Sequence, residues 1–154
     1  VNQALLKEIN EVNKCLISTV VDIGEEDISF DAAVNEVGPG TIVKCSFNAV
    51  TSGPDQIFLV LTMCLLVSSD YPNCSPVFLD KLPLELSKEQ EHLLLKARSK
   101  FTRSIRCLSQ PISVTEMAKS WDTCAGAVIL EYSVQNGGGS FSTRYGTWKT
   151  VSNS

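Results

Sequence analysis

Histidine and paired cysteines are scarce in this chain, and most metal and catalytic sites depend on them. His92 is the only histidine, and none of the six cysteines forms a C-x-x-C pair. Zinc sites need cysteine and histidine ligands at short spacings, so we expect no metal site. A Ser/His/Asp or Cys/His site needs an imidazole base, and His92 falls in the polar first turns of a predicted helix, where a surface histidine is expected. The sequence therefore predicts no catalytic residues, no cofactor and no enzyme activity.

Phosphate-binding loops and membrane-length apolar runs are also missing. The chain contains neither G-x-x-x-x-G-K-S/T nor G-x-G-x-x-G, and the run Gly137-Gly138-Gly139 follows a predicted helix instead of opening one. The longest apolar stretch, Ile57 to Val67, is interrupted only by Thr62. It is well short of the roughly 20 residues that span a bilayer. We expect a buried strand there, no nucleotide site and no membrane partner.

Length and cysteine usage indicate one soluble intracellular domain. A chain of 154 residues, 44% of them hydrophobic, is long enough for one core. Most of the cysteines fall in apolar or helical patterns, which predicts free thiols in a reducing compartment. We expect a single interaction domain over residues 1–139, with a flexible acidic loop at about 25–40, and a C-terminal tail over 140–154. Because the first residue is Val1, we also expect an excised piece of a longer protein.

The N-terminal segment has the periodicity of an amphipathic helix. Its apolar residues recur at steps of four, three, four and four, and the segment is expected to end near Gly24. An acidic stretch follows, in which Ile28 and Phe30 are expected to form a short edge strand. The residues that carry the helical pattern are Leu5, Ile9, Val12, Leu16 and Val20.

A change of period after Gly40 predicts strands. From Thr41 to Val50 apolar and polar residues alternate, as in a strand with one covered face. A turn at Ser52–Asp55 precedes the apolar segment Gln56–Ser68, so the two segments are expected to pair as an antiparallel hairpin, with the second strand central in the sheet. The buried face of the first strand should carry Val43, Cys45, Phe47 and Ala49.

The second half predicts two helices. Ser87 with Gln90, and Ser113 with Glu116, form capping-box patterns that mark helix starts. The first helix is expected to reach the stop at Pro111. With the short apolar segment at 77–79, the order predicts an α+β fold: an N-terminal helix, an antiparallel strand meander and two C-terminal helices packed on the sheet. The last helix should bury Met117, Trp121, Cys124, Val128 and Tyr132.

Positive charge gathers in the first of these two helices. Residues 1–86 carry 12 acids and 4 bases, a net charge of −8, whereas residues 87–154 carry 5 acids and 9 bases, a net charge of +4. The bases either form an ordinary solvated face or bind an acidic partner or a phosphate backbone. Protein is favoured over nucleic acid because Phe101 belongs to the core face and offers no stacking surface. The candidate partner-binding residues are Lys96, Arg98, Lys100, Arg103 and Arg106.

A proline-rich corner follows the second strand. Tyr71-Pro72-Asn73-Cys74-Ser75-Pro76 fits Y-P-x-x-x-P, and at this place in the element order it resembles the ubiquitin-conjugating and RWD-like superfamily. Tyr71, Pro72 and Pro76 would be structural, with the Tyr71 hydroxyl bonded to backbone. Active members follow the corner with His-Pro-Asn and a nucleophilic cysteine. Here the chain continues Val-Phe-Leu-Asp-Lys-Leu-Pro, and the next cysteine, Cys107, falls in a predicted helix, so no thioester transfer is expected.

Four longer strings resemble the C-terminal domain of the plant form of the fifteenth Mediator subunit, a transcription coactivator. The resemblance implies a nuclear, non-catalytic scaffold that couples activators to RNA polymerase II transcription. Its partners would be other Mediator tail subunits and acidic activator segments. The alternatives are a degenerate ubiquitin-conjugating-like domain of another pathway, and direct DNA binding through the basic helix. The strings are Gly40 to Asn48, Asp70 to Pro76, Arg106 to Pro111 and Gly137 to Trp148.

Overall fold

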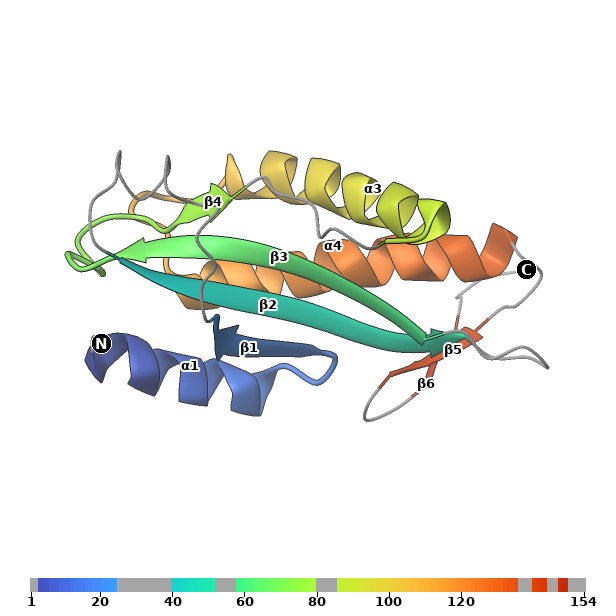
Figure 1. Ribbon diagram of the computed structural model, residues 1–154, viewed down its shortest axis with the longest axis horizontal. Coiled ribbons are helices and arrows are strands. Elements are labelled where there is room, and N and C mark those ends of the chain that lie inside the picture. Colours follow the sequence, from blue (N-terminus) through green and yellow to red (C-terminus); the bar gives the residue numbers. More distant parts are fainter. Residues whose placement is uncertain are drawn as a thin grey trace.

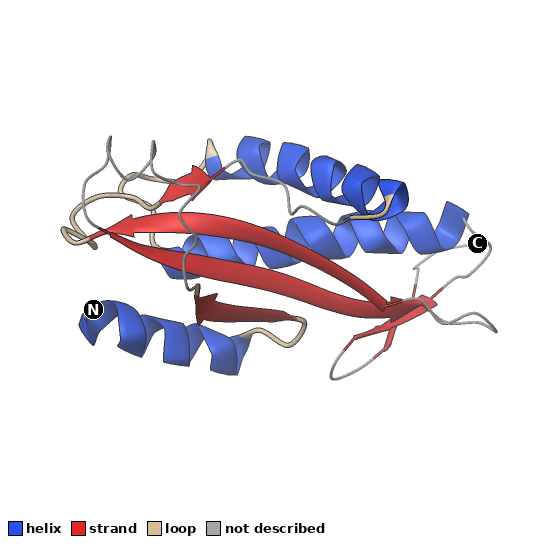
Figure 2. Cartoon of the chain, in the orientation of Figure 1, coloured by secondary structure: helices blue, strands red, loops and turns tan. Residues whose placement is uncertain are grey.

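In the part of the chain that the structure describes, the computed structural model has three helices and a six-stranded antiparallel sheet (Figure 1). The structure describes residues 3–24, 40–51, 58–79, 86–135, 140–143 and 147–149. Helix α4 lies behind the long strands β2 and β3 with α3 beside it, and α1 lies next to β1 and also contacts α4 (Figures 1 and 2). The elements are α1 (Gln3–Cys15), β1 (Thr19–Ile23), β2 (Gly40–Thr51), β3 (Phe58–Ser68), β4 (Val77–Leu79), α3 (Lys88–Ile105), α4 (Val114–Gln135), β5 (Ser140–Thr143) and β6 (Thr147–Lys149). The α+β class and the predicted order of elements are confirmed.

The N-terminal helix is shorter than its periodicity predicted. Helix α1 ends at Cys15, and the last part of the supposed helix is strand β1, paired antiparallel with β2. Four of the five residues of β1 are β-branched, which favours extended backbone. The Asn13 side chain also bonds both backbone groups of Val21, accepting from its N–H and donating to its carbonyl, each at 2.8 Å. The expectation of a helix to Gly24 was therefore wrong.

Strands β2 and β3 form the predicted hairpin. They pair over nearly their whole lengths, from Gly40 opposite Ser68 to Val50 opposite Phe58. The four residues predicted to face inward on β2 are all at most 4% exposed, and their partners on β3 are equally buried. Glycine is required at the start of β2, because a Cβ on Gly40 would lie 2.7 Å from the Val67 carbonyl oxygen. The turn predicted at 52–55, and the edge strand predicted around Ile28 and Phe30, lie outside the described residues.

Short strands extend the sheet on both sides of this hairpin. Strand β4 pairs with β3, which places β3 between β2 and β4. On the other side, β1 pairs with β2 up to Phe47, and β5 pairs with β2 from Ala49 to Thr51. Strand β6 then pairs with β5. Sequence reasoning left open whether the chain after Gly139 packs on the domain, and in the structure residues 140–143 and 147–149 join the sheet.

Both C-terminal helices begin as the capping patterns predicted. The Ser87 hydroxyl accepts the Gln90 N–H at 3.1 Å, and α3 starts at Lys88, directly after Ser87. Helix α3 ends at Ile105, earlier than the predicted stop at Pro111. Turns follow, in which the N–H groups of Cys107 and Leu108 donate to the carbonyls three residues earlier. No helix in the described ranges is long and apolar enough to cross a membrane.

Aromatic side chains join the helices to the sheet. Phe101 of α3 and Trp121 of α4 are fully buried and meet edge to face, with ring centroids 5.6 Å apart. Phe78 of β4 meets the other side of Phe101 at 5.4 Å. The Trp121 indole N–H donates to the Leu61 carbonyl at 3.1 Å, so its one polar atom is satisfied inside the core.

Trp121→Ala and Phe101→Ala should each lower the free energy of unfolding by about 3–5 kcal/mol, because each removes a buried aromatic ring and leaves a cavity. Urea denaturation followed by circular dichroism would measure this. Val134→Ala is the control, since Val134 is 53% exposed, and should change stability by no more than about 0.5 kcal/mol. An unchanged unfolding midpoint for Trp121→Ala would contradict its place in the core.

Candidate functional site

The Tyr71 hydroxyl joins three segments that are far apart in the sequence. Tyr71 is 4% exposed, in the corner that follows β3, and its hydroxyl donates to Glu8 Oε1 of α1 at 2.6 Å. The same oxygen accepts the backbone N–H of Val114, the first residue of α4, at 2.8 Å. Burial, and then the hydrogen bond to Glu8, raise the pKa of the Tyr71 phenol above its ordinary value, so the hydroxyl stays protonated at neutral pH. The hydroxyl was expected to donate to backbone within the corner, whereas it donates to a carboxylate of α1 and accepts from backbone of α4.

Every backbone N–H at the start of α4 has a partner. The Ser113 hydroxyl accepts the Glu116 N–H at 3.0 Å, and Glu116 Oε1 accepts the Ser113 N–H at 3.1 Å, which completes the predicted capping box. Glu8 Oε2 accepts from the Thr115 N–H at 2.8 Å and from its hydroxyl at 2.7 Å. A carboxylate at this position also interacts favourably with the positive end of the helix dipole. Local and distant side chains thus share the capping of α4.

The corner also fixes the connection between α3 and α4. The Ser75 hydroxyl donates to Gln110 Oε1 at 2.6 Å and accepts the Ile112 N–H at 2.7 Å. Beyond the connection, Ser120 of α4 donates to the Ser104 hydroxyl of α3 at 2.9 Å. These contacts, with the Phe101–Trp121 contact described above, hold α3 against α4 and determine which face of α3 points outward.

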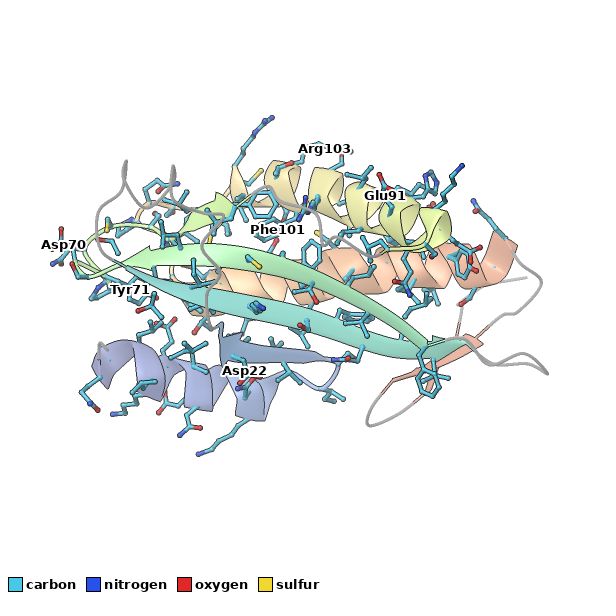
Figure 3. All side chains as sticks on the ribbon, viewed as in Figure 1. Asp22, Asp70, Tyr71, Glu91, Phe101 and Arg103 are labelled. Atoms are coloured by element: carbon cyan, nitrogen blue, oxygen red, sulfur yellow. The ribbon has the colours of Figure 1, made fainter. Side chains whose placement is uncertain are left out.

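The outward face of α3 carries three of the five predicted basic residues without a carboxylate against them in the described part of the chain. Lys100, Arg103 and Arg106 are exposed. Arg103 Nη2 lies 3.5 Å from the Ser99 hydroxyl, one turn earlier in the same helix. Figure 3 shows Arg103 pointing away from the sheet, whereas Phe101 points toward it. We call Lys96, Lys100, Arg103 and Arg106 the basic face.

Lys96 differs from these three residues because it is paired. Its Nζ lies 3.0 Å from Glu131 Oε1 on α4, and the side chains are 38% and 48% exposed. The hydrogen bond and charge of Lys96, with a smaller contribution from Lys100, lower the pKa of Glu131 below its ordinary value. An exposed pair of this kind contributes little to stability, roughly 0.2–1 kcal/mol at most. The pair therefore lies on the basic face without being needed to hold the helices together.

Arg98 does not belong to this surface, which corrects the sequence-based assignment. It is 5% exposed, and its guanidinium carbon lies 5.6 Å from the centre of the Phe78 ring. Two positions along a helix correspond to a rotation of about 200°, so Arg98 points away from Lys96 and Lys100 although it lies between them in the sequence. The sequence had placed Arg98 on a flank next to the stripe of Lys96, Lys100 and Arg103, whereas the structure buries it. Arg98 instead packs α3 against β4 through a cation–π contact.

The groups considered for chemistry are not brought together. His92 is exposed on α3, and Cys107 is exposed in the turn after α3, its sulfur 3.9 Å from the Arg103 carbonyl. All six cysteines are free thiols, and burial raises the pKa of Cys45 to about 12. Within the described ranges, histidine, cysteine and acidic side chains do not gather in groups of three that could hold a metal ion.

Sequence reasoning missed two residues of the site, Glu8 and Glu131. Both occupy polar positions of amphipathic helices, where a solvated carboxylate is the ordinary expectation. Their partners are 63 and 35 residues away, so no local pattern connects them. Only the packing of α1 and α3 against the rest of the fold shows what they bind.

The described ranges thus form an α+β domain in which the Tyr71 corner is bonded to α1 and α4 and basic side chains of α3 are exposed. Residues 38–126 match the model for the C-terminal domain of the ARC105/Med15 mediator subunit, and the chain belongs to that family. It is 47% identical, over 95% of its length, to Mediator of RNA polymerase II transcription subunit 15a of Arabidopsis thaliana. It is 33% identical, over 96% of its length, to the probable subunit 15c of the same organism. The matches span only 12% and 17% of those two proteins.

Tyr71→Phe should lower the free energy of unfolding by about 1–3 kcal/mol, because it leaves the buried Val114 N–H without its acceptor and Glu8 without a donor. Urea unfolding of Tyr71→Phe, Glu8→Gln and the double variant would measure this. If the two groups form one network, the double variant should lose less than the sum of the single losses. Strictly additive losses would contradict the coupling.

Proposed function

We propose that this domain is a non-catalytic interaction module of a Mediator tail subunit that helps couple transcription activators to RNA polymerase II in the nucleus. Membership of the Mediator subunit 15 family supports association with other Mediator subunits. Coupling to activators, the nuclear location and the absence of enzyme activity are parts of the proposal. We place its docking site on the basic face of α3, where it binds acidic segments of other Mediator subunits or of activators.

The observation that carries this proposal is the exposure of Lys100, Arg103 and Arg106 on a helix whose other side is fixed in the core. Rigid positioning lowers the entropy that is lost when a partner binds. Positive side chains on a presented surface steer negatively charged partners and select among them. The buried position of Phe101 and Trp121 also leaves these two rings unavailable for stacking on nucleic acid bases.

Reversing the charge of the basic face should abolish recovery of Mediator tail subunits. The test is affinity capture from an Arabidopsis nuclear extract with the parent chain and with the variant Lys100→Glu, Arg103→Glu, Arg106→Glu, followed by mass spectrometry. The loss is expected because each substitution replaces an attractive contact by a repulsive one.

A matched control variant changes the net charge by the same amount, but on surfaces away from the basic face. Lys7, Lys14 and Lys119 are exposed on α1 and α4, and their triple replacement by glutamate should leave recovery unchanged. Equal unfolding midpoints for the three proteins would show that folding is not the cause of a loss. Equal recovery by both variants would move the interface elsewhere. Salt-dependent binding of duplex DNA by the parent chain, lost in the basic-face variant, would favour the nucleic acid alternative.

A further inference from the structure

Glu131 provides an acidic contact to the basic face from within the domain. Its carboxylate meets Lys96 Nζ at 3.0 Å across the seam between α3 and α4, and Lys100 also contributes to the lowered pKa of Glu131. The carboxylate is therefore paired with Lys96, one of the four cations of the basic face. A carboxylate of an external segment could pair with Lys96 Nζ only in competition with it.

The contact between Lys96 and Glu131 can exchange with an external ligand. Both side chains are more than a third exposed, so either can swing into solvent without burying or stranding a charge. Exposed pairs gain little because water and salt screen them and because ordering two long side chains costs entropy. A partner carboxylate that approaches Lys96 thus meets a weak competitor.

We infer that Glu131 is an internal competitor for the basic face, and that an acidic protein segment binds along α3 by displacing it from Lys96. The inference rests on the proposed function, since it names the partner chemistry and the regulation of the same surface. When the segment binds, Lys96 leaves Glu131 and pairs with a carboxylate of the segment, while Lys100 and Arg103 each gain a carboxylate partner. Glu131 therefore lowers the affinity for weakly acidic segments and raises the number of well-placed carboxylates that binding requires.

The spacing of the cations indicates what the segment looks like. Lys96, Lys100 and Arg103 follow an i, i+4, i+7 pattern, which places them on one stripe and spreads them over about 10 Å of helix. A helical segment laid along α3 with acidic residues at the same intervals would match all three. Double-stranded DNA carries about one charge per 1.7 Å of its axis, and Glu131 would repel such a continuous row of phosphates. A peptide can place its carboxylates only where the cations are.

A designed peptide tests the inference directly. The probe is an alanine-rich helical peptide with glutamates at i, i+4 and i+7, and the control peptide has the same composition with the glutamates adjacent. Fluorescence anisotropy would measure the dissociation constant for the whole chain, for Glu131→Gln, for Lys96→Gln and for the double variant. Glutamine keeps the approximate size of each side chain and removes its charge.

Glu131→Gln should bind the probe roughly two- to fivefold more tightly than the parent, the range that corresponds to an exposed ion pair. In the Lys96→Gln background the same substitution should give a smaller gain, because the lysine for which Glu131 competes is absent. The control peptide should bind more weakly than the probe to every protein. Raised salt should reduce the gain, since exposed charges are screened.

Three results would overturn the inference. Equal affinities of the parent and Glu131→Gln would show that Glu131 does not compete. An equal gain in the Lys96→Gln background would show that it acts only as a general negative charge. Binding of duplex DNA without binding of the peptide would identify a different ligand. The first two results leave the proposed function intact if the basic-face variant still loses the Mediator subunits, whereas an unaffected capture would remove the proposed docking site from the basic face.

Discussion

The hydrogen-bonded contact between Glu8, Tyr71 and the start of α4 is the constraint on which the rest of the structure depends. A helix start leaves backbone N–H groups without partners, and burying them unpaired is costly. Here Ser113 and Glu116 cap two of them, while Tyr71 and Glu8 take the other two. The α4 N-terminus can be buried only when α1 and the corner are both in place. One helix end thereby joins the first helix, the sheet and the last helix.

The orientation of the basic face follows from this constraint. Because the corner holds both the start of α4 and the connection from α3, the two helices have a fixed register, with Ser104 opposite Ser120 and Lys96 opposite Glu131. The register buries Phe101 and exposes Arg103 on the same helix (Figure 3). The basic face therefore contains no residue of the corner, yet its geometry depends on the corner.

Local patterns predicted most of the fold, and distant contacts explain what they missed. The capping boxes and the alternation in β2 are properties of neighbouring residues, so they could be read from the sequence. The helical spacing of Leu16 and Val20 competed with the β-branched character of Thr19 to Ile23, and pairing with β2 decided the outcome. At the site, the bases of α3 were identified, but Arg98 was placed wrongly because angular position determines exposure. Glu8 and Glu131 carried no local signal at all.

The five bases from Lys96 to Arg106 divide into two kinds, and this division bears on how such a domain can bind partners. Arg98 is desolvated against Phe78 and has a structural role, so its charge is not offered to a ligand. Lys100, Arg103 and Arg106 remain hydrated, and Lys96 is held only by an exposed pair. Hydrated cations on a surface give fast, salt-sensitive association and a small desolvation cost, whereas buried ion pairs give slow dissociation. A surface made only of hydrated cations can therefore release one acidic segment and accept another.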